Sequence, residues 1–597
     1  MHMVPEILTP ERVTLPRLQF EWRRGSDDLV MESAGYGLKP ATSRTDHNRV
    51  WVFGSPTLDG RIDPDRVARH LADHGITEAF ARQLDGQYLL ILLSRDSKTL
   101  TVVNDRFTAI PVYMAATDDR IMGSLLYGDL RRRLNQIGQG GVRREAFFEF
   151  IWLQRLLGEG TLDVLSKCLG PASIAIFGPE IDRIDRYWIP NFSKRHGRSA
   201  HASGGEFSDI LSEAIVRKTS DAHEKRYGHF LSGGHDSRLV LAGFKDVLPA
   251  CLTVGFSENY EVACARRAAH AVGAGHSFLK LPDDYLTRYQ DILADLCGGL
   301  YATDNAIFAG FEAAVQSVAD VVFHGHGFDY LFQGMYVPSQ TVQWFGRPTF
   351  YRRLRPIDGD LAEFYLTNLP FGLGREDLLE YVLPDHRQHM KDWMIEGVRD
   401  VLATGAGCHN DYDRWEFLIT HNLCRHYSHP NIISKWTCAE PRAVSFDNAV
   451  YDFYLSLPLD LRLNGEAMRM ALKQLNPRLA HLPTGNTGLP AAASPTTKTA
   501  GLIARKLMRH LSGISRFRAP HAEDRTWPDR DTYIRTQPAY RGMILEAVES
   551  GLLADAMPYM DWGRIRSAVQ VWLSQPQGGA KFMVSLLSLH RALMRSL

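Results

Sequence analysis

The sequence has 597 residues, with 68 basic and 68 acidic side chains, so its formal net charge is zero. Hydrophobic residues make up 45% of the chain and charged residues 23%, which is ordinary for a globular protein. The balanced charge argues against a dedicated nucleic-acid-binding protein, and we expect no nucleic-acid partner. No stretch approaches the ~20 uninterrupted apolar residues of a membrane-spanning helix, so we expect no membrane span.

The cysteines indicate the redox compartment. There are seven, they lie far apart, and none forms a CxxC pair. This pattern is typical of reduced thiols in the cytoplasm rather than of a disulfide framework or a zinc site. The first six residues contain neither the basic nor the apolar segment of a secretory signal. We therefore predict a cytoplasmic protein.

The first 190 or so residues are predicted to be rich in β-strands. Residues 87–93 are an apolar run of strand length, a turn follows at 96–98, and residues 99–103 are rich in β-branched side chains. This sequence of features indicates a hairpin, and residues 110–114 predict a further strand. Between Pro190 and Gly205 the composition changes to Ser, Gly, His and Arg, which is typical of a linker.

Beyond residue 205 helices and strands are predicted to alternate. In chain order these are a helix at 206–219, a strand at 229–231, a helix at 237–244, a strand at 250–256, a helix at 261–272 and a strand at 321–323. Such strand–turn–helix alternation predicts a parallel sheet covered by helices on both faces. Residues 340–480 are predicted to be mainly helical.

The most informative segment is a glycine turn between a predicted strand and a predicted helix. Residues 231–237 read LSGGHDS. Glycines let the backbone approach an anion closely, the helix N-terminus adds free N–H donors, and Ser232 and Ser237 offer hydroxyls. We interpret the segment as a phosphate-binding turn that is not a Walker A loop, because the Gly-Lys-Ser/Thr ending is missing. Asp236 beside a polyphosphate is suited to holding Mg²⁺, while an ordinary Gly-Gly turn with a serine cap is the alternative.

This turn resembles the SGGxDS pyrophosphate loop of the asparagine synthetase superfamily, a branch of the ATP pyrophosphatases. Further similar blocks are residues 84–88 and 105–113, which resemble the LxGxF and DRFGxxPLY signatures of its glutaminase domain, residues 252–276, which resemble its adenine-side strand and helix, residues 325–334, which resemble GxGxDxLFxG, and residues 439–447, which resemble ExRxPFxD. The blocks occur in the order of the family and cover most of the chain.

The resemblance implies a fold with two domains. Residues 1–195 are expected to form an α+β, Ntn-type glutaminase-like sandwich. Residues 206–597 are expected to form an α/β ATP-pyrophosphatase domain, of the adenine nucleotide alpha hydrolase-like kind, with a parallel sheet.

The resemblance also implies which residues bind the nucleotide and the metal. The nucleotide-binding set is Leu231, Ser232, Gly233, Gly234, Asp236, Ser237, Val254, Gly255, Gly325 and Gly327. Asp236 and Asp329 are expected to hold Mg²⁺ on the phosphates of ATP. Physical reasoning supports this pair, because carboxylates at the carboxyl ends of neighbouring parallel strands converge on the crevice where ligands of such sheets bind.

A third acidic residue is assigned a catalytic role by the same resemblance. Glu440 aligns with a residue that, in β-lactam-forming relatives, orients a tyrosine acting as general base. Tyr412 and Tyr427 are both candidates for that tyrosine, and the sequence does not choose between them. The alternative for Glu440 is a salt bridge with Arg442.

Two departures from the family affect the expected reaction. Its glutaminases use a cysteine exposed at the N-terminus, whereas position 2 here is His2 and the first cysteine is Cys168. We therefore expect a structural N-terminal domain and a nitrogen donor other than glutamine. Relatives also carry a lysine that stabilises the reacting charges, near the place of Asn486, for which Lys473 and Lys498 are nearby candidates.

These inferences predict an ATP- and Mg²⁺-dependent ligase of the amide-forming class, EC 6.3, which adenylates the carboxylate of a small molecule or peptide and releases AMP and pyrophosphate. The acceptor amine is expected to belong to the substrate, as in lasso-peptide cyclases and β-lactam synthetases. One alternative is an asparagine synthetase that uses free ammonia. Another is a nucleotide-binding scaffold with weak or no catalysis, whose partner is a protein of the same biosynthetic cluster.

Overall fold

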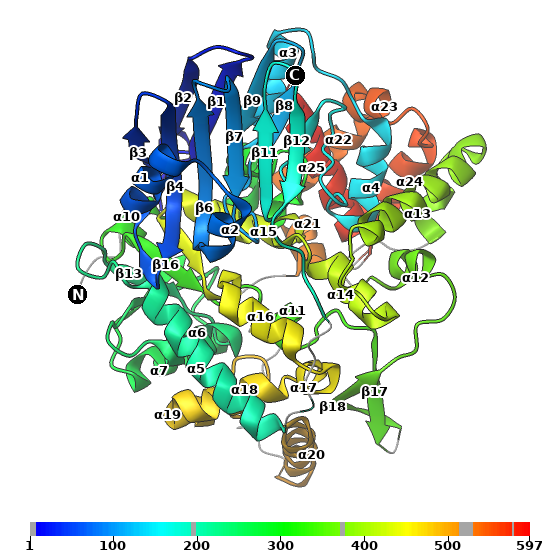
Figure 1. Cartoon of the computed structure of the whole chain (residues 1–597). Helices are drawn as coiled ribbons and strands as arrows, with labels where there is room; N and C mark the ends of the chain where they lie inside the picture. Colours follow the sequence, from blue (N-terminus) through cyan, green and yellow to red (C-terminus); the bar gives the residue numbers. More distant parts are fainter. Residues whose placement is uncertain are drawn as a thin grey trace.

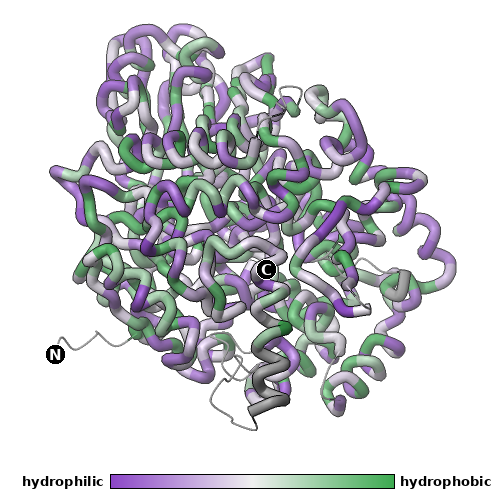
Figure 2. The backbone as a smooth tube through the Cα atoms, turned by 90° about the horizontal axis from the view of Figure 1, so that it is seen from below, coloured by the Kyte–Doolittle hydropathy of each residue, from purple (hydrophilic) through white to green (hydrophobic). Residues whose placement is uncertain are grey.

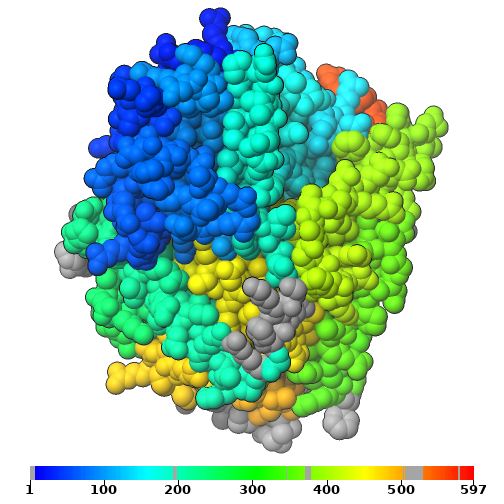
Figure 3. Space-filling model, in the orientation of Figure 1, coloured from blue at the N-terminus to red at the C-terminus, as the bar shows by residue number. Residues whose placement is uncertain are grey.

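The computed structural model describes residues 7–192, 197, 199–344, 346–369, 376–512, 529–575 and 578–596. In Figure 1 the strands of the first 190 residues stand together above a second layer of strands and helices formed by later residues. Figure 3 shows the same early residues as one continuous mass on this face, in contact with the rest of the chain. Hydrophobic and hydrophilic segments alternate along the whole tube (Figure 2), and none of the described helices is long and apolar enough to cross a membrane.

Two antiparallel sheets make up the early part of the chain. The first has the order β10-β8-β9-β1-β2 and consists of β1 (Arg17–Arg23), β2 (Leu29–Ala34), β8 (Tyr113–Ala116), β9 (Arg120–Ser124) and β10 (Ser166–Cys168). The second has the order β12-β11-β7-β6-β4-β3, with β5 paired to β4, and consists of β3 (Ala41–Arg44), β4 (Asn48–Leu58), β5 (Arg61–Ile62), β6 (Asp85–Ser94), β7 (Thr99–Asn104), β11 (Ser173–Phe177) and β12 (Asp182–Arg186). The predicted hairpin is confirmed as β6 and β7, whereas the strand predicted from residue 110 begins at Tyr113.

The two sheets pack face to face. One buried apolar cluster combines residues of the first sheet, such as Trp22 and Ile121, with residues of the second, such as Phe53, Ile91 and Val102. Helices α1 (Pro64–His74) and α2 (Glu78–Gln83) cover the other face of the second sheet, and α3 (Tyr127–Gln136) lies against β8 and β9 of the first. The predicted sandwich is therefore present as two sheets between layers of helices.

A parallel sheet forms the second layer, as the alternating pattern predicted. Its order is β15-β14-β13-β16-β19, from β13 (Tyr227–Phe230), β14 (Ala250–Gly255), β15 (His276–Lys280), β16 (Val321–His324) and β19 (Glu440–Ala443). All four pairings are parallel. Within this sheet the first strand along the chain is the central β13. The next two, β14 and β15, lie successively further out on one side of it, and β16 then pairs with β13 on the other side. The strand order therefore reverses between β13 and β16, and ligands of open α/β sheets bind at such a point.

Helix α5 (Ala200–Lys218) begins within the predicted linker, so the prediction of a linker from Pro190 to Gly205 was wrong over its last residues. The Ser199 hydroxyl caps the helix by accepting the backbone N–H of Ala202. Gly204 lies where α5 crosses α18, and a Cβ there would be 2.3 Å from the Cβ of Met470. The glycine that suggested a linker instead permits two helices to pack closely.

The rest of the chain is mainly helical, as predicted, apart from β19 and a hairpin of β17 (Ser339–Trp344) and β18 (Arg347–Leu354) that the sequence reading missed. Its α-helices, with those of the early part not yet given, are α4 (Arg144–Leu153), α6 (Asp236–Gly243), α7 (Tyr260–Ala271), α8 (Tyr285–Arg288), α9 (Gln290–Cys297), α10 (Glu312–Gln316), α11 (Phe328–Phe332), α12 (Leu361–Asn368), α13 (Arg387–Ala403), α14 (Asp411–Thr420), α15 (His429–Ile433), α16 (Asn448–Ser456), α17 (Leu459–Leu463), α18 (Glu466–Leu475), α19 (Pro477–His481), α20 (Pro495–Ser512), α21 (Arg530–Thr536), α22 (Pro538–Glu549), α23 (Gly551–Ala556), α24 (Trp562–Ser574) and α25 (Ala580–Ser596).

The main apolar core is shared between early and late parts of the chain. A single buried cluster includes Phe147 of α4, Leu231 after β13 and Leu586 of α25. Helix α25 also contacts α3 and α9, so the C-terminal helix packs against an element of the sandwich. The boundaries at residues 195 and 206 stay a prediction.

Glu312, the first residue of α10, provides a test of how burial affects stability. Only 5% of it is exposed, and burial raises the pKa of its carboxyl from 4.5 to about 7. The folded state therefore holds this proton more tightly than the unfolded state, and that stabilisation is lost as the pH rises from 4.5 to 7. We expect Glu312→Gln to stabilise the protein by about 2–3 kcal/mol at about pH 8 and to change little at about pH 4, measured by urea denaturation. An equal effect at both pH values would contradict this.

Candidate functional site

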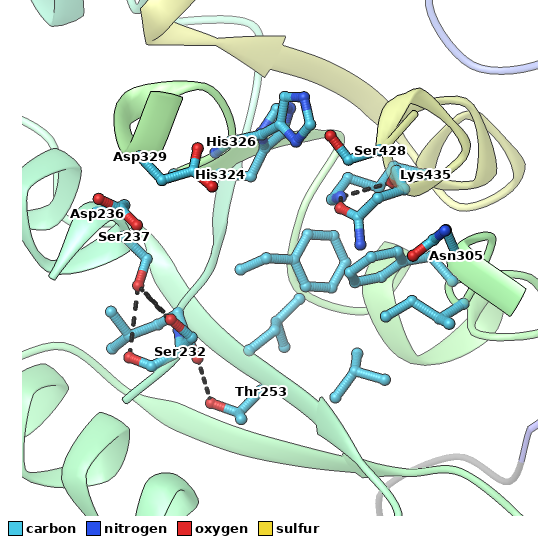
Figure 4. Close-up of a pocket in the computed structure, with 18 of the residues that line it drawn as sticks. Ser232, Asp236, Ser237, Thr253, Asn305, His324, His326, Asp329, Ser428 and Lys435 are labelled. Carbon is cyan, nitrogen blue, oxygen red and sulfur yellow. Dashed lines mark hydrogen bonds between the residues drawn. The ribbon is translucent and has the colours of Figure 1, made fainter. Parts of the chain in front are cut away.

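A cavity of about 320 Å³ opens at the carboxyl ends of β13, β14 and β16, where the strand order reverses (Figure 4). Strand β13 runs into Leu231 and Ser232, β14 contributes Val254, and β16 runs into Gly325. All four residues line the cavity. The parallel sheet therefore delivers polar turns from separate strands to one place.

The LSGGHDS turn is held in shape by hydrogen bonds within it and around it. The Ser232 N–H donates to the Ser237 hydroxyl at 3.0 Å, and the hydroxyls of Ser232 and Ser237 are also 3.0 Å apart. The Thr253 hydroxyl donates to the Leu231 carbonyl at 2.6 Å, which ties the turn to β14. Helix α6 starts at Asp236, so its first N–H groups lie at the turn. This is the geometry of an anion-binding turn.

Two half-buried carboxylates, Asp236 and Asp329, line the cavity together. Asp236 comes from the start of α6 and Asp329 from α11, and Figure 4 shows both on the same side of the cavity. The Gln333 side chain donates to Asp236 Oδ1 at 2.6 Å. Burial and the charge of Asp329 raise the pKa of Asp236 well above 3.8, and burial raises the pKa of Asp329 to about 6. Two such groups cannot both ionise at low cost without a cation.

The pair fits a magnesium ion. Mg²⁺ is usually bound by one or two carboxylates together with phosphate oxygens and water. Asp236 and Asp329 supply the carboxylates, and neither forms an ion pair with a basic side chain in the part of the chain that the structure describes. Within the same residues no group of three or more His, Cys, Asp or Glu side chains could hold a metal. A nucleotide and water would therefore have to complete the ligand set.

Glycine is required where β16 meets the turn. A Cβ on Gly325 would lie 2.4 Å from the backbone N of Ser237. Gly327 has φ +96°, and a Cβ there would lie 2.6 Å from the Ser445 hydroxyl. A side chain at 325 would therefore separate the Asp329 turn from the Asp236 turn, and one at 327 would be strained by the positive φ and would collide with Ser445.

The structure brings some of the predicted site residues to this cavity and not others. Those that line it are Leu231, Ser232, Asp236, Ser237, Val254, Gly325, Asp329 and Tyr427. Those that belong to the adjoining backbone without lining it are Gly233, Gly234, Gly255 and Gly327. Those that lie elsewhere are Tyr412 and Glu440.

Glu440 and its candidate tyrosines are not brought together. The Arg442 Nε donates to Glu440 Oε1 at 2.7 Å, and Glu440 lines a different cavity, which Gly37 and Arg442 also line. The Tyr412 hydroxyl donates to a backbone carbonyl, that of Arg355, at 2.9 Å. Tyr427 lines the candidate site and shares a 2.6 Å hydrogen bond with Tyr336. The structure therefore has the salt bridge that was the alternative for Glu440.

The Arg442 cluster is expected to matter for folding. Arg442 is 2% exposed, and besides Glu440 it donates to both oxygens of Asp221 at 2.7 Å. Burial raises the pKa of Asp221, but the hydrogen bonds and charge of Arg442 outweigh it and the net shift is downward. We expect Asp221→Asn to destabilise the protein by about 3 kcal/mol, because the buried Arg442 loses two charge-assisted hydrogen bonds and keeps Glu440 as its carboxylate partner. Denaturant titration measures this, and a change below about 0.5 kcal/mol would contradict it.

Comparisons with known proteins agree with this geometry. Residues 206–484 match the family model of asparagine synthase, and this segment contains the turn and both carboxylates. Residues 206–484 are an asparagine synthase domain. The comparison with curated proteins gives no match.

Two solved structures were also matched. One is described as the allosteric regulatory enzyme of purine biosynthesis, and the other as glutamine phosphoribosylpyrophosphate amidotransferase from B. subtilis complexed with ADP and GMP. Their sequence identities are 10% and 11%, and their TM-scores are 0.20 and 0.19. Each match covers 44% of this chain and 59% of the other, so the chain spans less than two thirds of either structure. Scores this low carry no argument about fold or function.

The cavity is lined by a lysine, Lys435, that the sequence analysis did not predict. Asn486 and Lys473 are exposed, Lys498 is half-buried, and none of the three lines the cavity. Lys435 does line it, together with His324. The only sequence signal for Lys435 is its isolation in an apolar run, and such a lysine is equally compatible with a surface helix. Its place in the cavity depends on how β19 joins the sheet.

Proposed function

We propose that this protein is an ATP-dependent ligase that activates a carboxylate as its acyl-adenylate and converts it to an amide. The observation that carries the proposal is one cavity, within an asparagine synthase domain, that combines an anion-binding turn with the half-buried carboxylates of Asp236 and Asp329. The same cavity has an apolar side formed by residues such as Leu252, Ile307 and Phe308, which suits a nucleobase.

In the proposed reaction a carboxylate oxygen of the substrate attacks the α-phosphorus of ATP. The bond from that phosphorus to the bridging oxygen breaks, and pyrophosphate leaves with the electron pair. An amine then attacks the acyl carbon, AMP departs, and the amine loses one proton. The free N–H groups at the start of α6 would bind the pyrophosphate, which they favour by charge and by the helix dipole.

Asp236 and Asp329 would hold Mg²⁺ against these phosphates. When bound, the ion would neutralise the charge that accumulates on the leaving pyrophosphate. The contribution of the chain itself is to keep both carboxylates partly shielded from water and close together, so that a cation favours the ionised form of both. Ser232 and Ser237 keep the turn in its binding shape.

We propose further that the amine comes from the substrate itself and not from glutamine. A glutaminase needs a reactive, accessible thiolate. Residues 1–192 contain one cysteine, Cys168, which is completely buried in β10 with its sulfur 4.0 Å from that of Cys424. This observation favours a reaction that joins an amine and a carboxylate already on the substrate over a glutamine-dependent one.

The test is to incubate the purified protein with Mg-ATP and separate panels of amino acids, hydroxy acids and short peptides, and to measure AMP and pyrophosphate. We expect both products in equal amounts with a particular carboxylate, and loss of a water molecule from that substrate by mass spectrometry when no ammonia is added. Release of AMP and pyrophosphate that requires glutamine would contradict the proposed amine source. Formation of ADP would contradict adenylation, because it requires attack at the γ-phosphorus. Binding of ATP without release of AMP on every panel would contradict the ligase and favour the nucleotide-binding scaffold.

A further inference from the structure

Lys435 is a buried cation in the wall of the candidate site. It belongs to a short 3-10 helix, Ser434–Thr437, just before β19, and it is 1% exposed. Its Nζ donates to the Asn431 carbonyl at 2.6 Å and to the Asn431 side chain, and lies 3.8 Å from the centre of the Phe308 ring. Among the described residues no carboxylate pairs with it.

An unpaired buried ammonium is costly to the fold. Burial lowers the pKa of Lys435 well below its ordinary value, because the charged form has lost its water. Lys218 provides the contrast, since it is 3% exposed but lies near Asp85 and Asp447, whose pKa values its charge lowers. Lys218 thus has acidic partners within the fold, whereas the hydrogen bonds that Lys435 forms within the described residues go to Asn431.

A buried donor that has no acceptor among the described residues lies in the same cavity. His324 is 3% exposed and lines the cavity beside His326. The His324 Nδ1 accepts the backbone N–H of His326 at 3.3 Å, so the neutral ring carries its proton on Nε2. That Nε2 is buried and has no hydrogen-bond partner among the described residues. After burial, the charge of Lys435 is the largest influence that lowers the pKa of both histidines, so the three groups are close.

The two polar ends of the cavity are separate. Figure 4 shows Lys435 and Asn305 on the side opposite Ser232 and Asp236. In the proposed function, the turn and Mg²⁺ neutralise the negative charge of the triphosphate at the Asp236 end. The ammonium of Lys435 at the other end, and the imidazole N–H of His324, which Figure 4 shows between Asp329 and Lys435, therefore suit a different anion, and a planar carboxylate can accept from both donors.

We propose that Lys435, with His324 as a second donor, binds a carboxylate of the acyl substrate at the end of the cavity opposite the phosphate-binding turn. This inference rests on the proposed function only in treating the cavity as the substrate site. It makes Lys435 a residue that selects substrates by charge.

The test compares thermal unfolding of wild type, Lys435→Met and the matched control Lys218→Met. The probes are acetate, malonate and aspartate, each against chloride at equal ionic strength, and Mg-ATP in a separate arm. We expect at least one carboxylate to raise the wild-type melting temperature, and Lys435→Met to need at least tenfold more of it. Lys435→Met should respond to Mg-ATP as wild type does and should melt at the same or a higher temperature, since an unpaired buried charge is replaced by an apolar chain.

Lys218→Met should melt at a lower temperature, because Asp85 and Asp447 lose one of two neighbouring cations and keep only Arg217 among the described residues, and should keep the carboxylate response. Lys435→Gln is the second variant should Lys435→Met fail to fold, because it is neutral and can still donate to Asn431. A carboxylate response that survives in the folded variant would overturn the inference. So would a wild type that none of the three carboxylates stabilises, or a variant that loses the Mg-ATP response instead.

The two proposals can fail separately. A carboxylate response that depends on Lys435, in a protein that releases no AMP, supports the carboxylate site and contradicts the ligase. AMP release that Lys435→Met leaves unchanged, at every substrate concentration, supports the ligase and contradicts the carboxylate site. A structural role alone would lower the melting temperature of Lys435→Met without changing its relative response to carboxylates.

Discussion

Asp329→Asn is expected to lower the rate of AMP and pyrophosphate release at least about 1000-fold. The amide cannot replace a carboxylate as a ligand of Mg²⁺, and the charge on the leaving pyrophosphate then loses its main stabilisation. Asp236→Asn is expected to act in the same way, because its carboxylate lines the same side of the cavity. Quantifying both products at saturating Mg-ATP with the active carboxylate measures the effect.

The stability of this variant separates lost chemistry from lost folding. Burial raises the pKa of Asp329 from 3.8 to about 6, so the folded state is destabilised by ionisation as the pH rises through that range. Asparagine carries no such charge, and we expect Asp329→Asn to melt at or above the wild-type temperature at about pH 8. Activity near wild type would contradict the assigned site, and a lower melting temperature would point to a structural carboxylate.

The matched control is Asp320→Asn. Asp320 directly precedes β16, at the end away from the cavity, and its side chain pairs with the half-exposed Arg226 at 2.8 Å. Exposed pairs contribute little to stability, so we expect less than about 1 kcal/mol of destabilisation and wild-type turnover. The comparison keeps the same substitution at the two ends of one strand.

Gly325→Ala is expected to abolish turnover by moving the two turns apart. The new Cβ would lie 2.4 Å from the N of Ser237 and 2.7 Å from the backbone carbon of Asp236, and backbone atoms at this distance must shift. We expect a loss of about 1–3 kcal/mol in stability from overpacking. We also expect at least about 100-fold lower turnover, since small displacements of binding groups have effects of this size. Urea denaturation and the product assay measure the two effects.

Gly275→Ala is the control for this substitution. Gly275 directly precedes β15 of the same sheet, and a Cβ there would meet no atom within 4 Å. The change should leave turnover unaltered and shift stability by less than about 1 kcal/mol. Equal effects of the two substitutions would show that the close approach at Gly325 is unimportant.

Local sequence patterns were sufficient to predict several elements. The β6–β7 hairpin follows from apolar and β-branched runs on either side of a turn, and the parallel sheet follows from repeated strand–turn–helix units. The phosphate-binding turn was also predictable, because its glycines, hydroxyls and helix start are contiguous in residues 231–237. A feature that is formed by residues adjacent along the chain can be predicted from their composition and spacing.

Residues far apart along the chain were harder to assign. Gly204 looked like part of a linker because its partner, Met470, is distant in sequence, and only the crossing of α5 and α18 reveals why it is a glycine. Glu440 was expected beside a tyrosine, but Arg442 is buried next to it and binds its carboxylate. Burial favours such pairings, since leaving a buried charge without a partner is strongly destabilising.

The sequence by itself determined that a phosphate-binding turn and a second acidic turn are present, because each is a short run whose chemistry is complete in its own residues. The convergence of Asp236 and Asp329 was also expected, but tertiary structure alone decided that Lys435, and not Glu440, lines the cavity with them. The physical reason is that strand order in the parallel sheet places the carboxyl ends of β13 and β16 side by side. No local pattern specifies that order, which follows from how all five strands pack.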